Sequence, residues 1–354
     1  MTIENLARDD VLSLRGYEAA EQAPETIRLN ANEAPFTHDA GDPALNRYPE
    51  VRPVTLQKRL ADLFGVPAAN LLVTRGSSEA IDVLVRAFCR AYRDTFVTTP
   101  PTFGMYRFYA DVQGVAIIEV PLARERDFAF DADALLDACT PTTKLVFLCS
   151  PNNPTGGRIA RADIAKIAEG RRGASIVVVD EAYVEFATEP SLAGEVADFE
   201  NLVVLRTLSK AHALAGARCG AAIASEAIIS VLRRVLPPYS FATPVVASVM
   251  AALGHDRVRR SAQSVAEIVA ERERLFTGLQ SSPRVIRTWP SEANFLLTEF
   301  DDLAVVREML RRRRILVRDY RDEPLLENCA RITIGTAAEN DALLDALRDP
   351  ERPA

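Results

Sequence analysis

The chain has 354 residues, of which 48% are hydrophobic and 26% are charged, so it can bury a large core in one big domain or in two. Its formal net charge of −7 argues against a general affinity for nucleic acid or for an anionic membrane. No apolar run approaches the roughly 18 residues that a membrane-spanning helix needs.

Three further features of the sequence limit the kind of protein it can be: its cysteines, its histidines and its first residues. Five cysteines are an odd number, and none belongs to a Cys-x-x-Cys pair, which is typical of reduced thiols in a cytosolic protein. The three histidines lie far apart in the sequence, so we expect no metal-dependent mechanism. The first ten residues contain acidic side chains and no apolar segment, so they do not resemble a secretory signal, and we expect a cytoplasmic protein.

Residues 1–50 predict an irregular N-terminal arm, because Asn and Pro are frequent there and oppose regular structure. Two segments of the arm, 29–35 and 46–50, also supply Asn, Tyr and Arg side chains that suit a binding site. The composition leaves two interpretations open. The arm is either a surface terminus or a segment that lies across a site, including the site of a partner subunit.

Residues 51–240 predict a large α/β domain. A helical pattern covers residues 54–64, and β-rich apolar runs then alternate with helical stretches. Seven such runs indicate a seven-stranded, mostly parallel sheet that is covered by helices on both faces. The runs are residues 71–74, 95–97, 115–120, 144–148, 175–179, 202–205 and 220–224.

Residues 241–354 predict a smaller α+β domain. We expect one long helix from about Pro244 to Leu279, followed by short strands at residues 294–297, 315–317 and 330–334. The four arginines at 311–314 close a helix ahead of a strand, where cations suit the C-terminal dipole. A solvated helix end explains them better than a nucleic-acid patch, given the acidic net charge.

Polar side chains follow several of the predicted strands at the point where each strand ends. After the first strand, Ser77 and Ser78 lie at a helix N-terminus, where unpaired N–H groups attract a phosphate. After the fourth, a rigid Pro-rich turn presents Asn153. Each of these segments taken alone is equally well an ordinary turn.

The fifth and sixth strands end in residues with clearer chemistry. Asp180 ends a wholly apolar run, so its carboxylate needs a partner in the interior, and Tyr183 follows it. Lys210 follows the sixth strand with Ser209 and Arg218 nearby. A plain surface lysine is the simpler interpretation of Lys210 alone, but a Schiff-base amine beside phosphate donors is the alternative.

The conjunction of these groups at the carboxyl ends of strands in one sheet fits pyridoxal phosphate, because ligands of open α/β sheets bind at that edge. In this interpretation, Asp180 keeps the pyridine nitrogen protonated and Asn153 and Tyr183 bond to the ring oxygen. Lys210 forms the Schiff base.

Three motifs carry a resemblance to the fold-type I aminotransferases: residues 150–156 (Ser-Pro-Asn-Asn-Pro-Thr-Gly), 180–183 (Asp-Glu-Ala-Tyr) and 207–218. Together with residues 29–33, 46–50 and 100–106, they resemble the histidinol-phosphate aminotransferase family, over about residues 28 to 335. The set is highly specific, although single motifs recur across the superfamily.

The resemblance implies roles for individual residues. Lys210 would be the Schiff-base lysine and Asp180 the partner of the pyridine nitrogen, with Tyr183 as a further catalytic residue. The other implied cofactor-binding residues are Ser77, Ser78, Asn153, Ser209, Arg218, Tyr106 against the ring face, and Tyr48 from the other subunit of a homodimer. The implied substrate-binding residues are Arg331, supported by Arg318, with Asn32 and Tyr17 in the arm.

Two departures from the family pattern bear on these roles. The arm has Ala34 where the family more often has Asn, which affects the predicted arm contacts. Ser77 and Ser78 stand where an Ala-Asp or similar pair is common, which affects the individual phosphate donors. Neither departure touches Lys210 or Asp180.

The resemblance implies a transfer of the amino group between histidinol phosphate and 2-oxoglutarate, with glutamate as the other amino acid, in histidine biosynthesis. The arm would join the small domain and contact the partner subunit, and no nucleic-acid or membrane partner is expected. Three alternatives stay open. They are an aromatic amino-acid aminotransferase, a threonine-phosphate decarboxylase-like lyase with the same cofactor, and a non-enzymatic binding protein on this fold.

Overall fold

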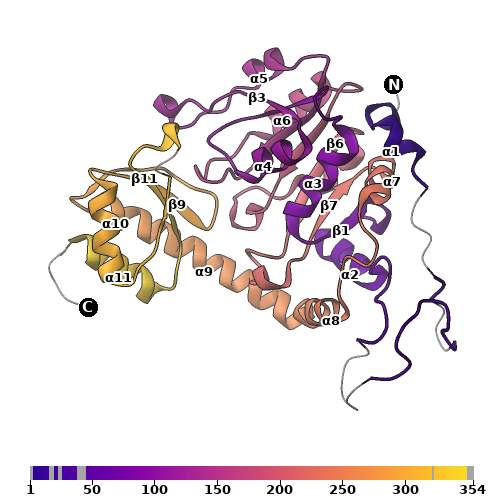
Figure 1. Cartoon of the computed structure of the whole chain (residues 1–354). Helices are drawn as coiled ribbons and strands as arrows, with labels where there is room; N and C mark the ends of the chain where they lie inside the picture. The colour runs from indigo at the N-terminus through magenta and orange to yellow at the C-terminus, as the bar shows by residue number, and fades with distance from the viewer. Residues whose placement is uncertain (1–2, 16–19, 23–25, 38–44, 321–322, 349–354) are drawn as a thin grey trace.

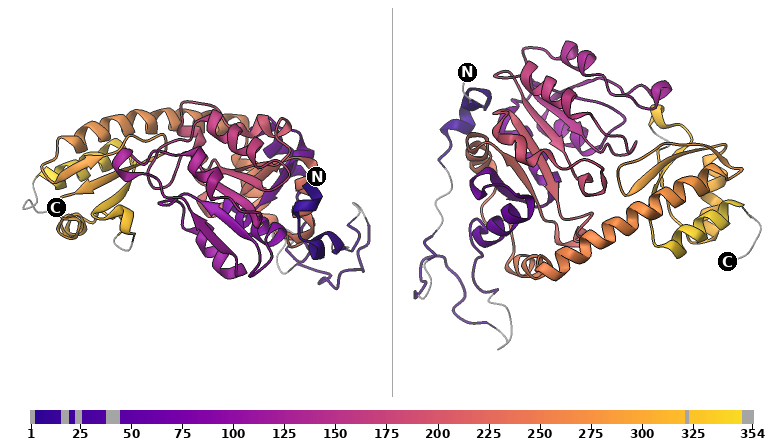
Figure 2. Two further views of the ribbon diagram at one scale, coloured as in Figure 1. Left: turned by 90° about the horizontal axis from the view of Figure 1, so that it is seen from above. Right: turned by 180° about the vertical axis from the view of Figure 1, so that it is seen from behind.

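The computed structural model describes residues 3–15, 20–22, 26–37, 45–320 and 323–348. Figures 1 and 2 show two bodies, each built around its own sheet, with the long helix α9 (His255–Gln280) running along both. The larger body holds a seven-stranded sheet and the smaller one a four-stranded sheet. Among the described residues, no helix combines the length and the apolar character that a membrane span requires.

The large sheet confirms the predicted fold. Its strand order is β1-β7-β6-β5-β4-β2-β3, and β7 is antiparallel to both of its neighbours, whereas the other pairs are parallel. The strands β4 to β7 are almost wholly buried, as their continuous apolar runs predict. The bounds are β1 Leu71–Thr74, β2 Thr95–Thr98, β3 Ala116–Glu119, β4 Thr143–Cys149, β5 Ile176–Asp180, β6 Leu202–Thr207 and β7 Gly220–Ala224.

Helices cover both faces of this sheet, and each face has its own apolar core. Side chains that alternate along the strands point to opposite cores, so Val178 packs on one face and Val179 on the other. One core includes residues of α1 (Asp9–Ser13), α3 (Gly76–Phe88), α4 (Met105–Gln113) and α7 (Glu226–Val235). The other includes residues of α2 (Val54–Phe64), α5 (Ala132–Ala138), α6 (Arg161–Gly170) and α8 (Thr243–Ala252).

The small sheet is antiparallel throughout, in the order β10-β11-β9-β8. It packs with the second half of α9 and two further helices around a separate core. The bounds are β8 Val285–Thr288, β9 Phe295–Phe300, α10 Leu303–Arg312, β10 Arg318–Asp319, β11 Cys329–Thr333 and α11 Ala337–Arg348.

The structure differs from the expected small domain in three places. The long helix expected from Pro244 is broken, because Gly254 has an extended backbone and begins α9 as its N-cap. The strand expected at 315–317 is replaced by the two-residue β10. Strand β8 was not predicted, because its two middle residues, Ile286 and Arg287, are exposed and give no regular apolar pattern.

The N-terminal arm is irregular as predicted, apart from the short elements η1 (Ile3–Leu6) and α1. These first residues are tied to the large body, since the backbone N–H of Arg8 donates to the carbonyl of Ala87. Beyond them the arm runs away from the body as extended chain (Figures 1 and 2). Ile27 and Leu29 in this part are each 90% exposed.

Candidate active site

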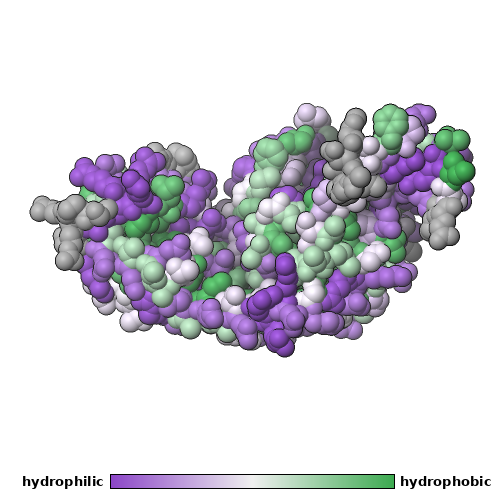
Figure 3. Space-filling view, turned by 90° about the horizontal axis from the view of Figure 1, so that it is seen from below, coloured by the Kyte–Doolittle hydropathy of each residue, from purple (hydrophilic) through white to green (hydrophobic). Residues whose placement is uncertain are grey.

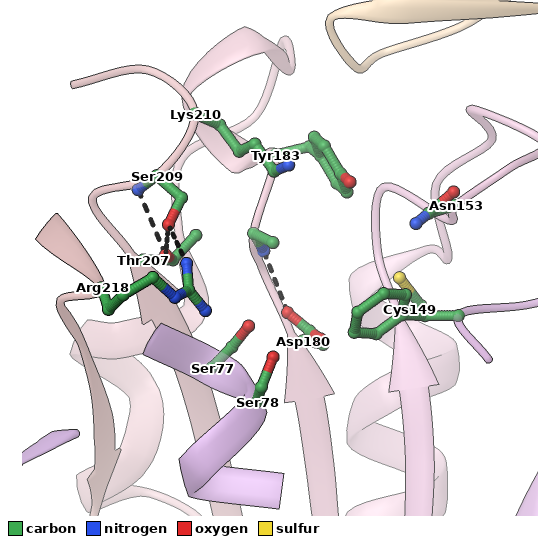
Figure 4. A pocket seen from close by; sticks show the side chains of 12 residues that line it. Ser77, Ser78, Cys149, Asn153, Asp180, Tyr183, Thr207, Ser209, Lys210 and Arg218 are labelled. Atoms are coloured by element: carbon green, nitrogen blue, oxygen red, sulfur yellow. Dashed lines mark hydrogen bonds between the residues drawn. The ribbon is translucent and has the colours of Figure 1, made fainter. Parts of the chain in front are cut away.

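A cavity of about 160 Å³ opens at the carboxyl edge of strands β4, β5 and β6. The parallel register brings these strand ends together, because Asp180 pairs with Cys149 on one side and with Leu205 on the other. Figure 4 shows the side chains that converge there. The lining residues are Ser77, Ser78, Phe103, Cys149, Asn153, Asp180, Ala182, Tyr183, Thr207, Ser209, Lys210 and Arg218.

Asp180 lies at the floor of the cavity and is 1% exposed. Its Oδ2 accepts a hydrogen bond from the Tyr106 hydroxyl at 3.1 Å, and its Oδ1 accepts one from the backbone N–H of Ala182 at 3.2 Å. Burial outweighs both bonds and raises the pKa of Asp180 to about 6. The site therefore holds a buried carboxylate that two neutral donors satisfy only in part.

Lys210 follows β6 and lies on the other side of the cavity from Asn153 (Figure 4). Its ammonium nitrogen is 5.6 Å from the centre of the Tyr183 ring. Desolvation lowers the pKa of Lys210, and the positive charges of Arg331 and Arg218 lower it further. These effects increase the share of neutral amine at a given pH, and the neutral amine is the nucleophilic form.

One end of the cavity is built to receive an anion. Ser77 and Ser78 belong to the first turn of α3, where the backbone N–H groups have no partner within the helix, and Figure 4 shows both serine side chains at this end. Arg218 donates to the Ser209 hydroxyl at 3.3 Å, and the Thr207 hydroxyl donates to the same oxygen at 3.0 Å. Hydroxyl groups and a guanidinium gathered at a helix N-terminus form a donor set that suits a phosphate.

Two glycines make this anion-binding end possible. A Cβ on Gly220 would lie 2.6 Å from the carbonyl oxygen of Arg206 and 3.0 Å from the backbone of Gly76. Gly76 itself has a φ of +76°, which side chains other than glycine rarely adopt. The turn before α3 therefore packs directly against β6 and β7.

The small sheet contributes Arg331, which lies on β11. Its Nη1 donates to the Asn153 Oδ1 at 2.5 Å, and its guanidinium lies 5.4 Å from the centre of the Phe295 ring. The Phe295 ring in turn packs edge-on against Tyr183 at 5.1 Å. A cation from the small body is thus held at the rim of a cavity that the large body forms.

Tyr106 does not line the cavity, in contrast to the expectation that it lies against a ring face. It lies in the first turn of α4, is 1% exposed, and stacks on Phe147 with 4.9 Å between the ring centres. Phe103 lines the cavity instead. The sequence segment 100–106 offers both aromatic residues, and the choice between them depends on where α4 begins.

Other lining residues were missed by the sequence reasoning. Thr207 ends β6 and bonds to Ser209, and its position two residues before Ser209 at a strand end was the available signal. Cys149 ends β4 as a buried neighbour of Asp180. Nothing in its sequence context indicated a cavity.

The remaining predicted site residues that the structure describes lie outside the cavity of this chain. Arg318 pairs with Arg331 across β10 and β11, and its guanidinium lies 5.9 Å from the Tyr320 ring centre. Asn32 and Tyr48 are exposed in the arm, where Tyr48 packs on Tyr239 with 4.9 Å between the ring centres. Tyr17 lies outside the described residues.

Residues 11–347 match the model of the aminotransferase class I and II family. The chain belongs to this family. It is 47% identical over 348 residues to the histidinol-phosphate aminotransferase of Stenotrophomonas maltophilia, which covers 97% of this chain and 95% of that protein. It is 42% identical over 358 residues to the enzyme of the same name from Xanthomonas campestris pv. campestris, with 100% and 99% covered. These matches confirm the resemblance found from the sequence motifs and show that the chain is an aminotransferase.

Solved structures share the fold of this aminotransferase. The histidinol-phosphate aminotransferase of Sinorhizobium meliloti, solved with pyridoxal 5'-phosphate, has a TM-score of 0.76 at 24% identity, with 86% of this chain and 83% of that chain covered. The L-threonine-O-3-phosphate decarboxylase of Porphyromonas gingivalis has a TM-score of 0.72 at 23% identity, with 86% and 90% covered. Because a transaminase and a decarboxylase both share it, the fold alone does not select the reaction.

Proposed function

We propose that this protein is a pyridoxal-phosphate-dependent aminotransferase of histidine biosynthesis. It would interconvert histidinol phosphate and 2-oxoglutarate with imidazole-acetol phosphate and glutamate. The observation that carries the proposal is the placement of Lys210, Asp180 and an anion-binding end around one cavity, with Arg331 at its rim. The full-length similarity to enzymes named for this reaction supports the choice of substrate.

The residues present fit the cofactor at both of its ends. The hydroxyl groups of Ser77, Ser78 and Ser209 and the Arg218 guanidinium would hold the cofactor phosphate. The raised pKa of Asp180 indicates that its carboxylate lacks a close cationic partner. At the other end of the cofactor, a protonated pyridine nitrogen would be that partner. Phe103 is the lining aromatic residue that would face the ring.

Asn153 and Tyr183 supply donors for the phenolic oxygen of the ring. Because the Asn153 Oδ1 already accepts from Arg331, its amide NH₂ is the group left to donate toward the cavity. Burial raises the pKa of Tyr183 well above its usual value, so its hydroxyl keeps its proton and can also donate.

Pyridoxal phosphate, when bound, supplies an electron sink that weakens the Cα–H bond of the amino substrate. The task left to the chain is to move that proton. Lys210 is the base on this side of the cavity, and its lowered pKa increases the share of neutral amine that can take up the proton and later return it. The small sheet places Arg331 at the rim of the cavity, where its guanidinium donates to Asn153.

Arg331 is the residue that we propose binds the anionic end of either substrate. Histidinol phosphate carries a phosphate and no carboxylate, whereas glutamate carries a carboxylate. A planar guanidinium grips both anions with two parallel hydrogen bonds. Arg318, adjacent in register, would support it. Asn32 and Tyr17 would belong to the substrate-facing arm.

We also propose a homodimer in which Tyr48 of each subunit reaches the cofactor phosphate of the other. The arm extends from the body with apolar side chains in water, including Ile27, Leu29 and Phe36. Helix α8 is apolar on nearly all sides, yet Val249 is its one buried residue among those described, and such helices are normally covered. Figure 3 shows apolar surface on the larger body beside the arm. A second copy of the chain would cover this surface.

We propose that the chain is organised in three units. Residues 1–50 would form an arm that contacts the partner, and its first described elements, η1 and α1, pack on the large body, in contrast to the expected junction with the small domain. Residues 51–240 would form the cofactor-binding domain, and residues 241–354 the small domain. We expect the enzyme in the cytoplasm, with no nucleic-acid or membrane partner.

A substrate panel tests the proposed function. The purified protein with cofactor is mixed separately with histidinol phosphate, phenylalanine and threonine phosphate, and the absorbance change of the cofactor is followed together with carbon dioxide release. We expect the fastest cofactor conversion with histidinol phosphate, repeated turnover only when 2-oxoglutarate is also present, and no carbon dioxide. Faster conversion of phenylalanine would support an aromatic aminotransferase, and carbon dioxide from threonine phosphate would support the lyase.

A further inference from the structure

The sole tryptophan of the sequence, Trp289, lies between the two bodies of the molecule. It follows β8 directly and is 2% exposed. The Phe128 ring contacts it with 5.1 Å between the ring centres, and the guanidinium groups of Arg287 and Arg124 lie 5.1 Å and 5.9 Å from its ring centre. Trp289 is therefore enclosed by side chains from both bodies.

The contacts from the large body come from residues 122–129, which we call the 122–129 turn. It leaves the edge strand β3 and reaches the small sheet, as the purple segment near η7 (Pro324–Leu326) in Figure 1 shows. The backbone N–H of Leu122 ties it to the large body by donating to the Pro100 carbonyl at 2.7 Å. Asp127 and Phe128 reverse its direction, with φ values of 60° and 59°.

Every long-range polar contact that the structure records for the rest of this turn is made with the small body. Asp127 forms an ion pair with Arg287. Arg124 donates to the carbonyl of Leu325 at 3.0 Å and pairs with the Glu299 carboxylate at 2.9 Å. The turn thus holds the small sheet by one buried ring contact and two ion pairs.

A short chain of contacts connects this junction to Arg331. The backbone N–H of Trp289 donates to the carbonyl of Leu297 at 3.0 Å. Leu297 is in turn the register partner of Arg331 across β9 and β11. Phe128 is therefore linked to Arg331, the proposed substrate-anion residue, by three consecutive contacts. The last two of these contacts lie within the small sheet that also holds Arg331.

We infer that the 122–129 turn is a positioning element for Arg331. Its hold on Trp289 sets where the small sheet lies over the cavity, and so it sets the affinity for the anionic end of the substrate. This inference rests on the proposed role of Arg331. Of the turn's contacts, the buried Phe128–Trp289 contact dominates, because Asp127 and Arg287 are 59% and 44% exposed in their side chains and an exposed ion pair contributes little.

The test measures anion binding apart from turnover. Glutarate, an unreactive dicarboxylate, is titrated into the cofactor-loaded enzyme, and its dissociation constant is obtained by calorimetry and by Trp289 fluorescence. The variants are Phe128→Ala and, as a milder change that leaves the ring contact intact, Asp127→Ala. Asp133→Ala is the matched control, because it removes the exposed ion pair with Lys166, which lies wholly within the large body.

We expect Phe128→Ala to weaken glutarate binding by about 3- to 10-fold, in the range of mutations that alter coupling between sites, and Asp127→Ala to weaken it less. Cofactor affinity should stay unchanged in all three variants, and the control should match wild type in both measurements. Addition of glutarate should change Trp289 fluorescence in wild type and change it less in Asp127→Ala.

Three results would overturn the inference. They are unchanged glutarate affinity in both turn variants, an equal loss of cofactor affinity, and no glutarate binding by wild type, which would leave no anion site to position. If Phe128→Ala fails to fold, Asp127→Ala and its fluorescence response decide the question. A wild type that binds glutarate but does not convert histidinol phosphate would refute the proposed reaction, while the affinity ratios of the variants would still test the turn.

Discussion

Asp180 shows how a single residue can carry a cost in stability that is recovered when a ligand binds. Its carboxylate is buried at the floor of the cavity, and its two recorded hydrogen-bond donors, Tyr106 and Ala182, are both neutral. Its pKa of about 6 in the folded protein lies above the usual 3.8, so the folded state holds the proton more tightly than the unfolded state does.

This pKa predicts that Asp180→Asn stabilises the cofactor-free protein at neutral pH. The contribution of Asp180 to stability falls as the pH rises from 3.8 to about 6, and the full penalty, up to roughly 3 kcal/mol, is present above that interval. The advantage of the variant should therefore be small at pH 4 and largest at pH 7 to 8. Urea unfolding of both proteins at several pH values measures it, and an advantage that is the same at every pH would contradict the assignment.

Lys210 is the residue on which turnover depends most. We expect Lys210→Ala to lower kcat by at least the roughly 10²- to 10⁴-fold that general acid–base catalysis provides, because the variant also loses the amine that bonds to the cofactor. Steady-state rates with histidinol phosphate, and borohydride trapping followed by peptide mapping, check this. Near-native turnover, or label on another lysine, would show that the assignment is wrong.

Arg331 is the residue that we propose contributes to substrate binding but not to cofactor binding. We expect Arg331→Lys to retain the cofactor but to raise KM for both histidinol phosphate and glutamate about tenfold or more, because an ammonium group cannot make two parallel hydrogen bonds to one anion. Kinetics with each substrate and absorbance titration with the cofactor give the comparison. Michaelis constants equal to those of wild type would rule out this role.

At the scale of elements, the sequence predicted well wherever a strand is buried on both faces. Strands such as β5 are continuous apolar runs with a polar residue at the end, so both the strand and its chemistry can be found. Side-chain direction within the segment 100–106 was harder to predict. Phe103 and Tyr106 are three residues apart, and the start of α4 at Met105 decides which one faces the cavity.

The small body was harder to predict for a related reason. Its short strands are partly exposed, so β8 has no regular apolar alternation, and the break between α8 and α9 depends on the backbone angles of Gly254. The proposed contact of Tyr48 depends on a second chain, which one sequence does not specify.

The packing of β7 against the turn before α3 gives a prediction for a glycine. We expect Gly220→Ala to lower the free energy of unfolding by about 1–3 kcal/mol and to weaken cofactor binding, because its Cβ would push the Gly76 backbone out of place. Gly194→Ala is the control, since a Cβ there meets nothing within 4 Å. Urea unfolding and cofactor titration measure both effects, and a Gly220→Ala protein that behaves like the control would contradict this account of the turn.

At the scale of the whole molecule, the proposed dimer places parts of one site on two chains. The test mixes inactive Tyr48→Ala protein with inactive Lys210→Ala protein until their subunits have exchanged. In a hybrid dimer, one of the two sites would then contain both an unchanged Lys210 and an unchanged Tyr48. Random pairing predicts activity returning to about a quarter of the wild-type value for the same total protein. Light scattering would show whether the protein is a dimer in solution. If activity does not return although subunits exchange, Tyr48 does not act across the interface.

The hydrogen bond from Arg331 to Asn153 links the proposed binding of the substrate anion to the proposed binding of the cofactor ring. In the proposed complex, Asn153 would face the cofactor ring and Arg331 the substrate anion. A mutation that shifts the guanidinium toward a longer or shorter substrate would then also change the polarity of the amide beside the ring. Evolution of a new amino donor on this scaffold would therefore require changes on both sheets at once.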